Sequence, residues 1–138
     1  MKQESGRSLI EIIGVLAIGV IMIVAAYSIY KTIDTRQKRL IAFDKLEEVV
    51  KKTKILYEYS GYADASIENL VAKGAISDAR PPFGTEWYLR PTTSFGKFYI
   101  VLKNVPNGDC KYLKIRLQNA DWVSRSAGTC QNVFMSVK

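Results

Sequence analysis

The sequence predicts an α+β protein in which one long N-terminal α-helix, with its first half in a membrane, packs against a small antiparallel β-sheet domain. Three observations carry this prediction. From Ile12 to Tyr30 the only clearly polar side chain is Ser28. No glycine or proline interrupts the chain between Val20 and Ser60, so a helix can continue there. After Gly61, short runs of aromatic and β-branched residues alternate with glycine and proline, as strands and turns do.

The apolar stretch nearly spans a bilayer. At 1.5 Å per residue, a helix over residues 12–30 is about 28 Å long, close to the roughly 30 Å hydrocarbon core of a membrane. Glu11 lies inside this apolar block. An ionised carboxylate costs on the order of 3 kcal/mol at the bilayer centre and less near the interface, and such groups usually face a partner. Glu11 therefore predicts a cation beside it.

Gly6 is followed by Arg7-Ser8-Leu9-Ile10-Glu11 and the apolar helix, and this arrangement resembles the N-terminus of type IV pilins and pseudopilins. The resemblance implies that a prepilin peptidase cleaves between Gly6 and Arg7 and methylates the new amine of Arg7. Glu11 is then the fifth residue of the mature chain, where the family carries a glutamate. In that family the glutamate pairs with the N-terminal amine of a neighbouring subunit, which offsets two otherwise unpaired charges.

Three features depart from the family. Arg7 stands where the family usually has phenylalanine, methionine or another apolar residue, and it adds a second cation beside the new amine. The leader, residues 1–6, is short and hardly basic. The proline that often kinks the pilin helix about twenty residues in is missing, and Ser28 stands near that place.

The prediction divides the chain into four segments: a leader at 1–6, a transmembrane and assembly helix at 7–30, an amphipathic second half of the helix at 31–60, and a globular pilin-like α+β domain at 61–138. The whole helix is expected to run from about Ser8 to Tyr59 and to end at Gly61, a length of roughly 78 Å. Its second half carries apolar residues at helical spacing, which predict a packed face: Ile33, Leu40, Phe43, Leu46, Val49, Val50, Leu56 and Tyr57.

The globular part begins with a short helix, for which Ser66 is the expected N-cap and Gly74 the stop. Strands are expected at 86–90, 97–102, 121–125 and 131–137, the last two on either side of Ala127–Gly128. Segment 110–118 fits both a strand and a helix, and helix is preferred. The aromatic residues of the first two strands are interpreted as a sheet core rather than a ligand platform: Trp87, Tyr88, Phe98 and Tyr99.

Cys110 and Cys130 are the only cysteines, and neither belongs to a CxxC or Cys/His cluster. Considered alone, they are either one disulfide in an oxidising compartment or two unpaired thiols. The resemblance implies the disulfide, because pilin C-terminal domains commonly carry such a bridge.

The composition argues against an enzyme. The chain has no histidine, the commonest general base and the usual partner of Ser and Cys nucleophiles. It also has no glycine-rich phosphate loop, metal-ligand spacing or nucleophile motif. We therefore expect no catalytic residue, metal or cofactor. The 20 Lys+Arg against 13 Asp+Glu give a net charge of +7, which permits a nucleic-acid partner, but the sequence has no dense basic run with interleaved aromatics to favour one.

The resemblance implies a structural subunit of a type IV pilus-like filament. Such a subunit is a single-pass protein of the inner (cytoplasmic) membrane with its C-terminal domain outside the cytoplasm. Its implied partners are further copies in a helical homo-oligomer, the prepilin peptidase, an inner-membrane assembly platform and, before assembly, membrane lipid. The positive-inside count favours the opposite orientation, because four cations closely follow the apolar run: Lys31, Arg36, Lys38 and Arg39.

Four alternatives stay open. The chain can be a pseudopilin of a type II-like secretion system, a DNA-uptake filament subunit, or a plain membrane-anchored domain with no processing at Gly6. It can also carry an ordinary signal peptide, since the small residues at 24–26 suit a signal peptidase.

Overall fold

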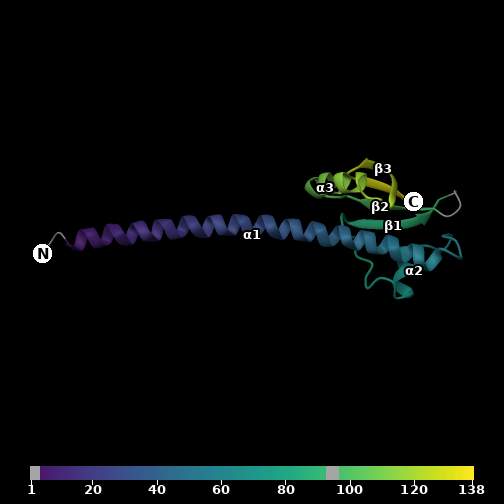
Figure 1. The fold of residues 1–138 in the computed structure, drawn as a ribbon, viewed down its shortest axis with the longest axis horizontal. Coiled ribbons are helices and arrows are strands. Elements are labelled where there is room, and N and C mark those ends of the chain that lie inside the picture. The colour runs from purple at the N-terminus through teal and green to yellow at the C-terminus, as the bar shows by residue number, and fades with distance from the viewer. Residues whose placement is uncertain (1–3, 93–96) are drawn as a thin grey trace. The chain divides into compact units, whose positions relative to one another are not determined.

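The computed structural model describes residues 4–92 and 97–138, with side chains from Ser8 onward. Its elements in chain order are α1 (Glu4–Tyr57), α2 (Ile67–Ala72), β1 (Glu86–Pro91), β2 (Phe98–Lys103), α3 (Asn107–Gln118), β3 (Val123–Thr129) and β4 (Asn132–Val137) (Figure 1). The chain forms two compact units, residues 1–38 and 39–138, and α1 contributes to both. The predicted α+β class is confirmed.

The helix α1 begins four residues before the predicted Ser8 and ends at Tyr57, two residues before the predicted Tyr59. The end is fixed by Gly61, whose backbone N–H donates to the Tyr57 carbonyl oxygen at 3.0 Å. Gly61 has a φ of 79°, a conformation that glycine adopts without the steric cost of a Cβ atom.

In the unit of residues 39–138, one face of α1 enters the core as predicted, through Phe43, Leu46, Val49, Val50 and Tyr57. Leu40 and Leu56 share this apolar spacing but are 45% and 38% exposed. Thr53 is the one buried polar residue of the described chain. Its hydroxyl donates to the Val49 carbonyl oxygen at 2.7 Å, so this buried hydroxyl is paired.

The four strands form an antiparallel sheet in the order β1-β2-β4-β3. Because successive side chains point to opposite faces of a strand, the predicted aromatic core divides in two. Trp87 and Phe98 are buried in the core with α1, whereas Tyr88 and Tyr99 lie on the opposite face. The inner face is lined by apolar side chains from all four strands: Trp87, Leu89, Phe98, Ile100, Leu102, Val123, Val133, Met135 and Val137.

The predicted turn at Ala127–Gly128 is wrong. Strand β3 continues through these residues to Thr129, and the chain reverses at Cys130–Gln131. Gly128 has a φ of 100°, and a Cβ atom at this position would collide with the Asn132 carbonyl oxygen. The glycine therefore lets β3 pass close to β4 and does not mark the turn.

Both predicted short helices form. The Ser66 hydroxyl accepts from the backbone N–H of Asn69 at 3.2 Å and caps α2. The ambiguous segment 110–118 belongs to the helix α3, which begins at Asn107 after Pro106. Its buried residues, Cys110, Leu113 and Leu117, recur at helical spacing.

Cys110 of α3 is bonded to Cys130 in the β3–β4 turn, 20 residues further along the chain. Two backbone hydrogen bonds fasten the same turn to the segment before α3. The N–H of Asn104 donates to the Gln131 carbonyl oxygen at 2.9 Å, and that of Val105 donates to the Cys130 carbonyl oxygen at 2.8 Å. The bond therefore holds α3 beside the end of the sheet.

We expect the double variant Cys110→Ala/Cys130→Ala to lose about 3 kcal/mol of unfolding free energy, because the loop between the cysteines is no longer closed in the unfolded chain. Thermal unfolding of the full chain in neutral detergent micelles measures this loss. Wild type treated with a reductant should shift in the same way, and an unchanged melting temperature in both samples would contradict the prediction.

Candidate functional site

The first part of α1 exposes almost all of its apolar side chains. Within the described residues, one helix is long and apolar enough to cross a membrane, Ser8–Tyr57, with a mean hydropathy of 2.8 over its most apolar stretch. No part of that stretch is buried by the rest of the chain. Exposed large side chains follow one another along it: Leu9, Ile10, Ile12, Ile13, Val15, Leu16, Ile18, Val20, Ile21, Met22, Ile23, Val24, Tyr27, Ile29 and Tyr30. Such a surface requires lipid or other helices around it.

Glu11 is exposed near the N-terminal start of this surface. Its neighbours Ile10 and Ile12 are 72% and 55% exposed, and Glu11 makes no hydrogen bond or ion pair with any side chain from Ser8 onward that the structure describes. The predicted cation is therefore not supplied by this part of the chain. Gly6 and Arg7 lie in the first turns of α1, and the Arg7 side chain is outside the described residues. Cleavage, methylation and pairing at these residues stay predictions.

The hydroxyl groups further along α1 are satisfied within the helix. Thr32 donates to the Ser28 carbonyl oxygen at 3.1 Å, and Thr35 donates to the Lys31 carbonyl oxygen at 2.9 Å. Because these bonds are internal to the helix, the hydroxyls can enter apolar surroundings without an unpaired donor.

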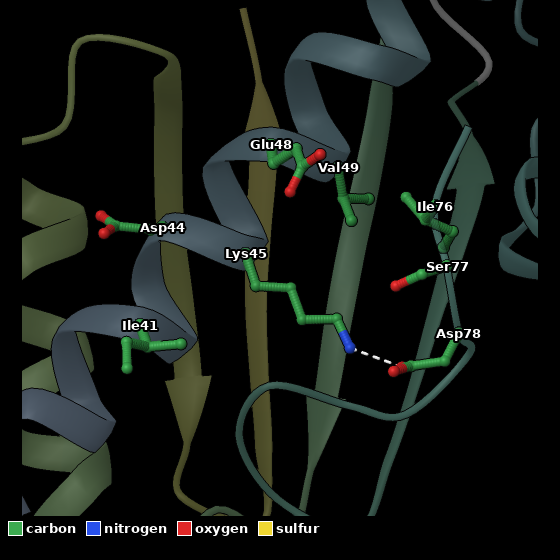
Figure 2. A pocket seen from close by; sticks show the side chains of 8 residues that line it. All are labelled: Ile41, Asp44, Lys45, Glu48, Val49, Ile76, Ser77 and Asp78. Carbon is green, nitrogen blue, oxygen red and sulfur yellow. Dashed lines mark hydrogen bonds and ion pairs between the residues drawn. The ribbon is translucent and has the colours of Figure 1, made fainter. Parts of the chain in front are cut away.

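A groove of about 450 Å³ lies between α1 and the segment after α2. Figure 2 shows the Lys45 side chain reaching from α1 across this groove to Asp78. The Lys45 ammonium donates to Asp78 Oδ1 at 2.6 Å and to the Arg80 carbonyl oxygen at 2.9 Å. The indole of Trp87 donates to the Ala79 carbonyl oxygen at 2.7 Å. These contacts hold residues 78–80 against α1 and the sheet.

The Lys45 ammonium, which donates to the carboxylate, and the Arg80 backbone N–H, which donates at 2.9 Å, hold the pKa of Asp78 below its ordinary value of 3.8. Hydrogen bonds from both groups are stronger when the Asp78 carboxylate is ionised, so they stabilise its ionised form.

A second ion pair joins α1 to α3. Arg39 Nε donates to Asp109 Oδ1 at 2.7 Å, with both side chains about one third exposed. Asp109 lies in the first turn of α3, where the helix dipole also favours a negative charge.

Sequence reasoning missed both long-range ion pairs. Lys45 and Asp78 are 33 residues apart, and Arg39 and Asp109 are 70 apart. Surface cations and carboxylates are too common for a sequence to show which of them meet. A local ion pair on α1 joins Glu47 and Lys51 at 2.7 Å. In residues 8–92 and 97–138, no group of three or more His, Cys, Asp or Glu side chains is placed to hold a metal ion.

Comparison with known proteins gives no assignment. No protein-family model matches the chain, and neither a curated protein nor a solved structure matches it.

The Asp78 contact predicts an acid-dependent loss of stability. Because the folded pKa lies below the unfolded one, the contact contributes fully above pH 3.8 and is lost as the pH falls through the folded pKa. The variant Asp78→Asn should therefore be less stable than wild type near neutral pH, and the two should converge in acid. Chemical unfolding over a pH series measures the difference.

Asp44→Asn is the matched control, because Asp44 lines the same groove without an ion pair in the described structure. A difference between wild type and Asp78→Asn that stays constant into acid, or that Asp44→Asn reproduces, would contradict the assignment.

Proposed function

We propose that the chain is a structural subunit of a type IV pilus-like filament, made as a single-pass membrane precursor and cleaved after Gly6. One observation carries the proposal. The rest of the chain does not cover the apolar first part of α1. The second part of α1 belongs to a small α+β unit with a four-stranded antiparallel sheet and one disulfide. This architecture is pilin-like.

The exposed apolar helix supports two successive environments. In the membrane its side chains contact lipid, and in a filament they contact the equivalent helices of other copies. Lipid tails and apolar side chains are similar in polarity, so the transfer changes the surroundings of the helix without exposing it to water.

Glu11 supports a specific arrangement within that bundle. Its carboxylate has no partner in the described part of its own chain, and a carboxylate among apolar helices needs a cation. Cleavage after Gly6 creates an α-ammonium on every copy, and the ammonium of a neighbouring copy would supply the missing charge. Arg7 places a guanidinium next to that ammonium and so strengthens the positive end of the contact.

The disulfide supports a location of residues 39–138 outside the cytoplasm. Disulfides persist in oxidising compartments and are rare in the cytosol. This consideration opposes the cations that follow the apolar run, which favour the reverse orientation. We give the disulfide more weight, because a prepilin-type N-terminus has its own export machinery.

We predict that Glu11→Ala lowers filament yield at least about tenfold, because it leaves the neighbouring ammonium unpaired in an apolar bundle. The measurement is the mass of sheared filaments from a host that supplies a prepilin peptidase and an assembly platform, with the membrane-bound precursor quantified in parallel. The precursor should stay at the wild-type level.

Glu58→Ala serves as the control, because it removes an exposed carboxylate just after the end of α1. Wild-type filament yield from Glu11→Ala, or an equal loss in the Glu58→Ala variant, would overturn the assembly role of Glu11.

A further inference from the structure

The sheet face opposite α1, here called the outer face, combines aromatic and cationic side chains. Strand register places them in cross-strand rows. One row contains Tyr88, Val101, Phe134 and Ala127, and the next contains Arg90, Tyr99, Ser136 and Arg125. A third row adds Glu86, Lys103, Asn132 and Thr129. Tyr99 and Phe134 thus lie on the two central strands and Tyr88 lies on the edge strand β1, with the cations in the two rows on either side of the Tyr88–Phe134 row.

Two of the cations lie over the Tyr88 ring, and the rings of Tyr99 and Phe134 contact each other. The centroids of the Tyr99 and Phe134 rings are 4.9 Å apart, with an angle of 33° between the planes. The Arg90 guanidinium lies 5.3 Å from the centroid of the Tyr88 ring, and the Lys103 ammonium lies 5.5 Å from it. The three rings are partly exposed. Val101 is buried among them, at 6% exposure.

The charge of this face is positive. Arg90, Lys103 and Arg125 contribute three cations, and Glu86 is the single carboxylate in the three rows. Glu86 is 3.4 Å from the Lys103 ammonium, and this pair is exposed enough to contribute little to stability. The sequence does not reveal the cluster, because its members come from four strands.

Sheet stability alone does not account for the combination. The diagonal contact of Tyr99 with Phe134 and the cations over the Tyr88 ring both stabilise the sheet, but Arg125 takes part in neither contact. Aromatic rings with cations beside them match a ligand that has both π-faces and negative charge. Unpaired nucleotides have both, because their bases stack on aromatic rings and their phosphates pair with cations.

We propose that the outer face binds single-stranded nucleic acid. Bases stack on the rings of Tyr88, Tyr99 and Phe134, and phosphates contact Arg90, Lys103 and Arg125. Tyr88 and Phe134 are two strands apart, about 10 Å, which leaves room for a base at each ring. The proposal does not depend on filament assembly, since every residue of the site belongs to one copy.

The test uses the full chain in neutral detergent micelles and a fluorescent oligothymidylate of about 15 nucleotides. Fluorescence anisotropy gives the binding constant at increasing salt concentration. Three phosphate contacts predict a slope of about −2 for log K against log salt, a loss of about 15-fold between 50 and 200 mM. A duplex of the same length should bind about tenfold more weakly, because its bases are already stacked.

Two sets of variants separate charge from stacking. Arg90→Gln/Lys103→Gln/Arg125→Gln should lower affinity at least about tenfold at low salt and bring the slope close to zero. Tyr99→Leu/Phe134→Leu should lower affinity by about tenfold with the slope unchanged. The matched control, Lys52→Gln/Lys111→Gln/Lys114→Gln, makes the same change in net charge on α1 and α3 and should keep affinity within about twofold.

Thermal unfolding of each variant reports whether it is folded. If the aromatic variant does not fold, the charge variant and its control still test the proposal. Absence of binding at 50 mM salt would overturn the proposal. Equal losses of affinity in the charge variant and its control would also overturn it. So would a duplex and the polyanion heparin that bind as tightly as the single strand.

Discussion

One constraint governs the first part of α1, which is that no part of its most apolar stretch is buried by the rest of the chain. Its isoleucine, leucine and valine side chains are half to three-quarters exposed, so water is not their working environment. A membrane anchor and a signal sequence both have such a helix, and in the proposed filament equivalent helices would cover it. The hydroxyls of Thr32 and Thr35, bonded to carbonyls within α1, suit both lipid and a helix bundle. Glu11 does not suit either one without a cation.

The unit of residues 39–138 meets a different constraint, because it must fold around a single helix face. Residues of α1 enter the core from one side and the inner sheet face closes it. The peripheral elements are attached by specific links: Lys45 holds the segment at Asp78, Arg39 holds the start of α3, and the Cys110–Cys130 bond ties α3 to the β3–β4 turn. The outer sheet face takes no part in this core. It is therefore free to carry the aromatic and cationic residues from which we infer nucleic-acid binding.

Features of local origin could be predicted from the sequence, whereas features that need tertiary contact could not. The long helix follows from uninterrupted apolar and helical periodicity, and the α2 cap follows from Ser66 at its start. Gly128 was misread as a turn, because a glycine that allows close approach of two strands is the same in sequence as one that reverses the chain. Tyr88 and Tyr99 were assigned to the core with Trp87 and Phe98, because adjacent aromatic residues hide the two-residue alternation of a strand. Strand register brings together the aromatic and cationic residues of the outer face, which lie between positions 88 and 134 of the chain. A single sequence does not show this register. Glu11 stands out in the sequence as a carboxylate inside an apolar block, whereas the proposed cleavage between Gly6 and Arg7 rests on the resemblance alone.

The central claim is that the N-terminal segment is a prepilin-type processing and assembly signal. Intact mass and N-terminal sequencing test it most directly, on the full chain co-produced with a prepilin peptidase and on a Gly6→Leu variant. The account predicts a mature wild-type chain that begins at N-methylated Arg7, and an uncut Gly6→Leu chain. A wild-type chain that stays uncut, or one that begins near Tyr27 after conventional signal-peptide cleavage, would contradict it.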